Sequence, residues 1–127
     1  MTVGCSREVT IDDAWVRAAP PGAGMTAGYL TVHNATAQTV TLVSASSDSH
    51  GDAMLHESFV ENGTSKMRHL DDLPVHANSD AVFEPGGKHL MLMAPTHDLA
   101  EGDVVKLTLH FADGSTITVD ADVRRDQ

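Results

Sequence analysis

The sequence predicts an all-β fold, either an antiparallel β-sandwich or a Greek-key β-barrel of seven or eight mostly antiparallel strands. Apolar and polar residues alternate along many short runs rich in β-branched side chains, which is the pattern of half-buried strands. Helical periodicity is hard to find. Two dipeptides, Asn62-Gly63 and Asp113-Gly114, lie between alternating runs and favour tight hairpin turns. Regularly spaced short strands with turns between them are typical of sandwiches and barrels.

The expected strands follow one another along the chain. In chain order they cover residues 8–18, 27–34, 39–46, 53–60, 64–70, 80–85, 104–112 and 115–123. The first contains Asp12 and Asp13, where we expect a β-bulge. Loops are expected at residues 19–24, 84–89 and 94–103, and the last leaves room for one helical turn near Asp98 to Ala100.

The composition fits one domain. The chain has 127 residues, 41% of them hydrophobic, which is enough for a sizeable core. We expect a flexible tail over residues 1–7, a single β domain over 8–124 and a short C-terminal tail over 125–127. A net charge of −10 argues against nucleic acid and anionic membrane as partners. No stretch is long and apolar enough to be a transmembrane segment.

The start of the chain carries the one cysteine, Cys5. It cannot form an internal disulfide or a thiolate metal cluster by itself. No signal peptide is visible, because Met1 to Ser6 has no basic start and no apolar run. The sequence Thr-Val-Gly-Cys fits the remnant of a lipoprotein cleavage box with Cys5 as the lipidated residue, and the alternative is an incidental cysteine in a tail.

Residues 88–93, Lys-His-Leu-Met-Leu-Met, fit either a buried strand or part of a soft-metal site. If the run is extended, His89, Met91 and Met93 lie on one face, and Leu90 and Leu92 lie on the other. His89 and Met91 can then supply two corners of a tetrahedral site. Met93 is expected to pack in the core or behind the ligands.

The hairpin over residues 53–70 offers two more ligands. With a two-residue turn at Asn62-Gly63, His56 faces His69, and Met67 becomes a diagonal neighbour of His56 on the same face. His56 and Met67 could therefore share a metal ion, with His69 as a rival ligand. Met54 lies on the same face. A three-residue turn would shift this register.

The remaining histidines and methionine fit ordinary structural roles. Met25 follows a Pro/Gly loop and is expected to fill a gap at an edge or in the core. Histidines within strands are expected to be packed or solvated, and those in polar loops are expected to be exposed. The strand histidines are His33 and His110, and the loop histidines are His50, His76 and His97.

Two imidazoles and two thioethers favour Cu(I), because thioether sulfur is a soft ligand. A thioether needs no deprotonation, and it cannot be lost to disulfide formation. Zinc rarely uses Met, and a blue-copper centre needs a cysteine beside its histidines. Residues 48–52 lack the spacing of a calcium loop. The side-chain types alone still leave open a buried strand that binds no metal.

The spacing of these residues resembles one known family. His56, ten residues, Met67, twenty-one residues, His89, one residue and Met91 reproduce the pattern H-x10-M-x21-H-x-M of the periplasmic copper chaperone family written PCu(A)C. The blocks AWVRAAPPGAGMTAGYLTVHN, MLHES, KMRHL, EPGGKHLMLM and LAEGDVVKLTLHF also look like that family, so the resemblance covers nearly the whole domain. One departure is Glu57, since many members have Met after the first histidine.

The resemblance implies a cupredoxin-like Greek-key β-barrel that holds Cu(I) near its surface through His56, Met67, His89 and Met91. It implies a location in the periplasm or on the cell surface, and a chaperone role in copper homeostasis and cytochrome c oxidase assembly. The implied partners are the copper-bearing subunit of the oxidase, with its copper A centre, and Sco-type thiol proteins. Trp15 and Tyr29, which match the family, are expected to be structural.

Three functions remain open at this stage. The leading one is a copper carrier rather than an enzyme, because a Cu(I) site with four protein ligands leaves no open position for a substrate. The second is a copper buffer or Cu(II) scavenger, in which extra histidines form a secondary Cu(II) site. Those histidines are His50, His69, His76 and His97. The third is a β-sandwich interaction module that binds no metal.

Overall fold

A computed structural model describes residues 8–20, 22–96 and 98–125 and shows an all-β fold, with no helix in those residues. The strands are β1 (Val9–Arg17), β2 (Met25–Asn34), β3 (Val40–Ser47), β4 (His50–Glu61), β5 (Thr64–Leu70), β6 (Leu73–Val75), β7 (Ser79–Phe83), β8 (Lys88–Pro95), β9 (Val104–Phe111) and β10 (Thr116–Arg124). The predicted fold class is therefore confirmed. Within the described ranges, no helix is long and apolar enough to cross a membrane. Cys5 and His97 lie outside the described residues.

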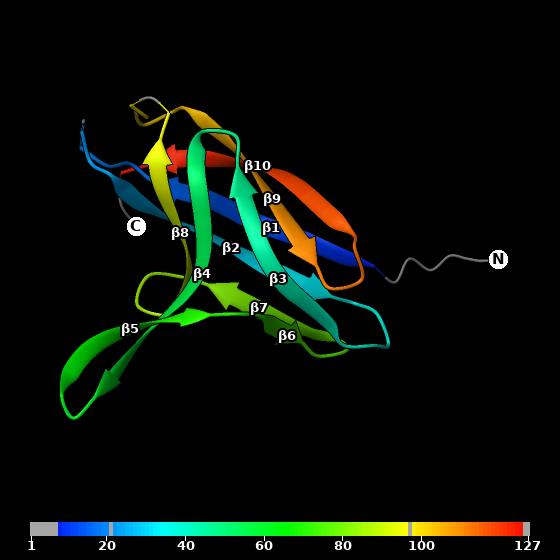
Figure 1. The fold of residues 1–127 in the computed structure, drawn as a ribbon. Coiled ribbons are helices and arrows are strands. Elements are labelled where there is room, and N and C mark those ends of the chain that lie inside the picture. The colour runs from blue at the N-terminus through cyan, green and yellow to red at the C-terminus, as the bar shows by residue number, and fades with distance from the viewer. Residues whose placement is uncertain (1–7, 21, 97, 126–127) are drawn as a thin grey trace.

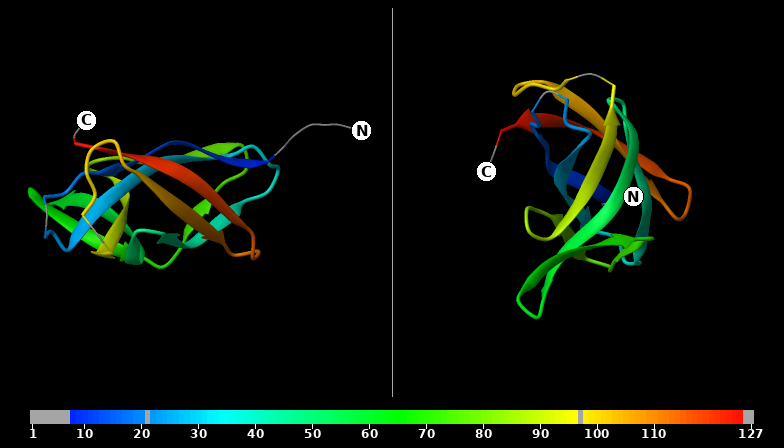
Figure 2. Two further views of the ribbon diagram at one scale, coloured as in Figure 1. Left: turned by 90° about the horizontal axis from the view of Figure 1, so that it is seen from above. Right: turned by 60° about the vertical axis from the view of Figure 1, so that its left-hand side comes forward.

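The strands form one sheet that curls into a barrel (Figures 1 and 2). Their order is β5-β4-β8-β7-β2-β1-β10-β9-β3-β6, and additional pairings of β4 with β3 and of β8 with β2 close the barrel. Two pairs, β1 with β10 and β7 with β8, are parallel, and the other pairs are antiparallel. β5 and β6 are the two edge strands of the sheet, at either end of this strand order.

The bulge predicted in β1 is present. The pairing of β1 with β2 shifts register between Asp12 and Trp15, and Asp13 has a positive φ of 56°. Past the bulge, Trp15 pairs directly with Tyr29, and their ring centroids lie 4.7 Å apart. Both rings are buried. This packing agrees with the structural role that the family resemblance implied for them.

Three local expectations differ from the structure. β6 was not predicted; it contains Pro74, and a strand at the end of the sheet tolerates a missing N–H donor. β4 begins at His50, within a segment read as a polar loop. Residues 98–100 form no helical turn. Within the described residues the structure has ten strands, against the seven or eight expected.

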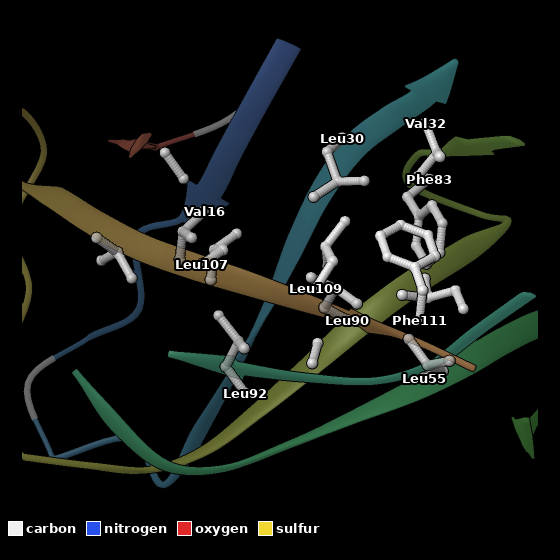
Figure 3. Close-up of a cluster of buried hydrophobic side chains, with 14 of the residues drawn as sticks. Val16, Leu30, Val32, Leu55, Phe83, Leu90, Leu92, Leu107, Leu109 and Phe111 are labelled. Atoms are coloured by element: carbon white, nitrogen blue, oxygen red, sulfur yellow. The ribbon is translucent and has the colours of Figure 1, made fainter. Parts of the chain in front are cut away.

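The core is made by the inward faces of the closing strands. Leu90 and Leu92 of β8 are fully buried and pack with Leu55, Leu107 and Leu109 in one apolar cluster (Figure 3). His89, Met91 and Met93 alternate with these two leucines along β8 and therefore point to its other face, as the alternation predicted.

Candidate metal site

β4 lies between β5 and β8 and brings three histidines into one row. His56 pairs with His69 of β5 on one side and with His89 of β8 on the other. The β4–β5 register is the one predicted from the sequence, because Asn62 and Gly63 both adopt positive φ and form the two-residue turn between Glu61 and Thr64. The β4–β5 hairpin extends beyond the body of the barrel (Figure 1).

The four residues of the spacing pattern gather on the outward face of these strands. Nδ1 of His56 lies 3.3 Å from the sulfur of Met67. The ring centroids of His56 and His89 lie 5.7 Å apart. Met91 is diagonal to His56, since it pairs directly with Met54. Met67, His89 and Met91 also line one open groove. The structure thus brings together all four residues expected from the sequence.

The contact between His56 and Met67 already has the spacing of two ligands on one ion. Metal–nitrogen and metal–sulfur bonds of about 2.0 and 2.3 Å at a tetrahedral angle place the two ligand atoms about 3.5 Å apart. The distance of 3.3 Å between Nδ1 and the sulfur is close to that value. This pair therefore needs little rearrangement to bind a metal.

His89 is held in one tautomer. Its side chain is buried, with the residue only 5% exposed, and Nδ1 lies 3.2 Å from the carbonyl oxygen of Gly87. A carbonyl oxygen can only accept, so Nδ1 of the neutral ring donates and Nε2 keeps its lone pair. A backbone carbonyl that orients a ligand histidine in this way is common at metal sites.

The pKa of His56 is lowered from its ordinary value of 6.5, first by burial and then by the neighbouring His89 and His69 rings. The neutral ring is the form that binds a metal, and a lower pKa reduces competition from protons. Within the described residues, no three His, Cys, Asp or Glu side chains lie close enough to hold a metal ion. The methionine sulfurs are therefore essential to any site at this place.

Comparisons with known proteins agree with this fold. Residues 9–123 match the family described as "Putative lipoprotein LpqE-like". The chain belongs to this LpqE-like family. It is 37% identical over 117 residues to "Putative lipoprotein Lxx21020" of Leifsonia xyli subsp. xyli, covering 91% of this chain and 69% of that protein.

Two solved structures resemble this LpqE-like chain. The copper-bound PCuAC domain from PmoF2 superposes with a TM-score of 0.78 at 22% identity, covering 93% of each chain. At this identity the similarity establishes a shared fold and not a shared function. The Cu(I) form of DR1885 from Deinococcus radiodurans has a TM-score of 0.73 at 31% identity, covering 91% of this chain and 76% of that one. The predicted barrel architecture is thus that of PCuAC domains.

Glu57, where this LpqE-like chain departs from the resemblance, points away from the candidate ligands. Its carboxylate accepts hydrogen bonds from Arg68, at 2.7 Å to Nη2, and lies 3.6 Å from Nζ of Lys88. Arg68 and Lys88 are its direct partners on β5 and β8. Glu57 therefore ties the three strands together on the face opposite the histidine row.

Apart from His69, the other histidines that the structure describes in this LpqE-like chain lie outside the candidate site. His50 is buried, not exposed as expected, and its Nδ1 lies 2.8 Å from the hydroxyl of Ser47. His76 is exposed in a loop, as expected. His33 is part-exposed between two carboxylates. His110 is part-exposed on β9.

Sequence reasoning missed that Met25 borders the same groove. Met25 is 56% exposed, so it does not fill a core gap. It pairs directly with Met93, and both residues lie on the outward face. The pairing of β2 with β8 was the missing information, and it is set by barrel closure rather than by a local pattern.

Proposed function

We propose that the protein is an extracytoplasmic Cu(I)-binding chaperone whose ion is held by His56, Met67, His89 and Met91. The observation that carries the proposal is the contact of 3.3 Å between His56 Nδ1 and the Met67 sulfur, beside the fixed ring of His89. Two imidazoles with two thioethers suit Cu(I). The Cu(I) form of DR1885 supports the same cargo.

The uneven exposure of the ligands suits a carrier rather than a catalyst. His89 is 5% exposed and anchored by Gly87, whereas Met67 is 52% exposed on the projecting β5 strand. An incoming thiolate or imidazole would reach the ion from the Met67 side and replace that thioether first. The less exposed ligands, His89 above all, would hold the ion until exchange is complete. Four protein ligands leave no open position for a substrate, so we propose no enzymatic activity.

The proposed recipient is the copper A centre of cytochrome c oxidase, reached directly or through a Sco-type protein, as the PCu(A)C resemblance implies. Transfer would be measured by mixing the Cu(I)-loaded protein with a copper-free fragment of the copper-bearing oxidase subunit or with a reduced Sco-type protein. Copper should leave the donor in at least one mixture. Retention in both would contradict this choice of recipient without affecting the binding site.

The family description, which names a lipoprotein, supports a location outside the cytoplasm, in the periplasm or at the cell surface. Cys5 is the proposed lipid attachment point. Mass spectrometry of the protein isolated from membranes of its own host would show an acylated N-terminal cysteine. An unmodified Cys5 would contradict the anchor.

The site is tested by a Cu(I) titration in competition with a chromophoric chelator. We expect about one ion per chain, and loss of binding when Met67→Leu and Met91→Leu are combined, because leucine keeps the volume and removes the sulfur. The matched control combines Met25→Leu and Met93→Leu, which removes two sulfurs from the same face and should leave the titration unchanged.

An unchanged titration in the variant that lacks the Met67 and Met91 sulfurs would refute the site. Thermal unfolding separates the carrier from an interaction module that binds no metal, because a ligand that binds only the native state must raise Tm. A Tm that does not respond to Cu(I) would favour the interaction module.

A further inference from the structure

We propose that the groove beside the candidate ligands docks a carboxylate-bearing segment of the protein that receives the ion, with Arg17 binding the carboxylate. Met67, His89 and Met91 border this groove, and Arg17 and Tyr29 border it too. This inference rests on the proposed function, because the occupant is the protein to which a carrier would pass its cargo. It adds the chemistry by which that protein is recognised.

Arg17 is a part-buried cation without a carboxylate partner in the described parts of the chain. Acidic side chains number 18 against 8 Lys and Arg, and five other described cations each lie within 3.6 Å of a carboxylate: Lys66, Arg68, Lys88, Lys106 and Arg124. Arg125 forms no such pair with a described residue either, but it is exposed to water. Nε of Arg17, in contrast, is shielded from solvent and has no hydrogen-bond partner among the described residues. A buried donor without an acceptor is costly, and an acceptor supplied by another molecule would remove that cost.

Aromatic packing, rather than an ion pair, holds Arg17 in place. Val16 enters the core, so its neighbours Trp15 and Arg17 point to the outer face of β1. The guanidinium carbon of Arg17 lies 5.4 Å from the centroid of the Tyr29 ring, and that ring packs on Trp15 at 4.7 Å. A cation over an aromatic face is attracted to it, and the guanidinium N–H groups at the edge stay available as donors. The arginine is therefore pre-organised on two buried rings, which lowers the entropic cost of binding a ligand.

The lining of the groove has the composition of a protein interface. The centres of such interfaces are enriched in Met, Tyr and Arg and depleted in Lys, Asp and Glu. Met25, Met67, Met91, Tyr29 and Arg17 line the groove, and no Lys, Asp or Glu is among its described lining residues. The volume of about 410 Å³ lies in the range of about 300–1,000 Å³ that is usual for ligand sites. The groove therefore suits an inserted segment better than a flat contact.

Charge selects the group that enters the groove. Arg17 is the one permanently charged side chain among the described lining residues, and a guanidinium binds a carboxylate through two parallel hydrogen bonds. Asp98 borders a neighbouring pocket that Arg17 also lines, but the two side chains form no ion pair. Cu(I) held by imidazoles and thioethers would keep its positive charge, because all of these ligands are neutral, and would add to the attraction.

The rest of the molecule limits which surface can present that carboxylate. The net charge of −10 repels a uniformly acidic surface and also a second copy of this chain. The occupant is therefore a single Asp or Glu on a neutral or basic surface of the receiving protein. Binding of its carboxylate to Arg17 would bring that surface against Met67, the most exposed of the proposed ligands.

The carboxylate site is tested in the copper-free full chain with two blocked peptides, acetyl-Ala-Glu-Ala-amide and acetyl-Ala-Gln-Ala-amide. Nuclear magnetic resonance follows the arginine Nε–H groups and the methionine methyl groups. The Glu peptide should shift the Arg17 and Met25 signals saturably, with a Kd of about 1–10 mM, and the Gln peptide should not. Arg17→Gln should weaken Glu-peptide binding about tenfold or more, and Arg17→Lys should retain part of it, because lysine keeps the charge without the paired donors. Arg124→Gln is the matched control and should change nothing, because Arg124 pairs with Arg17 across the strands and lies over Trp15 but does not line the groove.

The role in docking is tested by the rate of Cu(I) transfer to whichever copper-free recipient accepts the ion. Arg17→Gln should slow transfer about tenfold or more at low salt and less at high salt, while Cu(I) affinity in the chelator competition stays within about threefold. No shift with the Glu peptide, equal shifts with both peptides, or an unchanged transfer rate would overturn the inference and leave the Cu(I) site standing. A concentration-dependent dimer that Arg17→Gln abolishes would identify a second copy as the occupant and would also overturn it. If the Glu peptide binds but Cu(I) does not, the proposed function fails while the carboxylate site stands.

Discussion

The two faces of β8 should separate stability from copper binding, and Leu92→Ala tests this. Leu92 is fully buried in the core cluster, whereas its neighbour Met91 points to the site. Removing the equivalent of three methylene groups at about 0.8 kcal/mol each gives about 2.4 kcal/mol, and the remaining cavity raises the loss to about 3–4 kcal/mol. A loss of this size should lower Tm by about 10–15 °C in a domain of this length.

Urea unfolding of the copper-free protein measures the loss, and the Cu(I) titration measures the site. We expect Leu92→Ala to keep a stoichiometry of about one, because its side chain faces away from the ligands. The matched control on the same strand is Met93→Ala, which is part-exposed and should lower the free energy of unfolding by about 1 kcal/mol. If Leu92→Ala removed copper binding while stability stayed near the wild-type value, the assignment of the two faces would be wrong.

Two further predictions concern charges outside the ligand set. Both ring nitrogens of His33 face carboxylates, with 2.9 Å from Nε2 to Asp12 and 2.8 Å from Nδ1 to Asp80, and the hydrogen bond with Asp80 is the main cause that raises the His33 pKa above 6.5. Because the pKa is raised, the stabilisation by His33 is full below about pH 6.5 and is lost as pH rises through the folded-state pKa. The difference in unfolding free energy between wild type and His33→Asn should therefore shrink between about pH 6 and pH 8.5. A difference that grows over this range would contradict the argument. Glu57→Gln should lower the free energy of unfolding by about 0.5–1 kcal/mol, because it removes the ion pairs with Arg68 and Lys88. These pairs lie on the face opposite the ligands, so the Cu(I) stoichiometry should not change. Loss of Cu(I) binding in a variant that urea unfolding shows to be folded would contradict that placement.

Local features of the fold could be predicted because short-range chemistry determines them. Asn62 and Gly63 adopt the positive φ angles that a two-residue hairpin turn needs, so the pairing of His56 with His69 followed from counting outward from the turn. The bulge at Asp12 and Asp13 is similarly local. Alternation also placed Leu90 and Leu92 on the face of β8 opposite His89 and Met91, whereas Met93, expected in the core or behind the ligands, is part-exposed.

The meeting of β4 with β8 could not be predicted from local patterns. These strands are separated along the chain by β5, β6 and β7, and their pairing depends on closure of the whole barrel. No turn residue in the sequence predicts that His89 pairs with His56. The family resemblance supplied that expectation through the spacing alone. For the same reason, the burial of His50 beside Ser47 and the exposure of Met25 at the groove became visible only in the structure.

The hairpin register matters more for this site than for the barrel, because the hairpin extends beyond the barrel's body (Figure 1). A slip of one residue in β5 would turn Met67 and His69 to the opposite face and present Lys66 and Arg68 to the ion. Two cations in place of a thioether and an imidazole would repel copper. In the observed register, Arg68 pairs with Glu57, and Lys66 lies 2.8 Å from Glu61 on the face away from the ligands. These ion pairs oppose the slip together with the Asn62-Gly63 turn, so charges that never touch the ion help to keep its ligands in place.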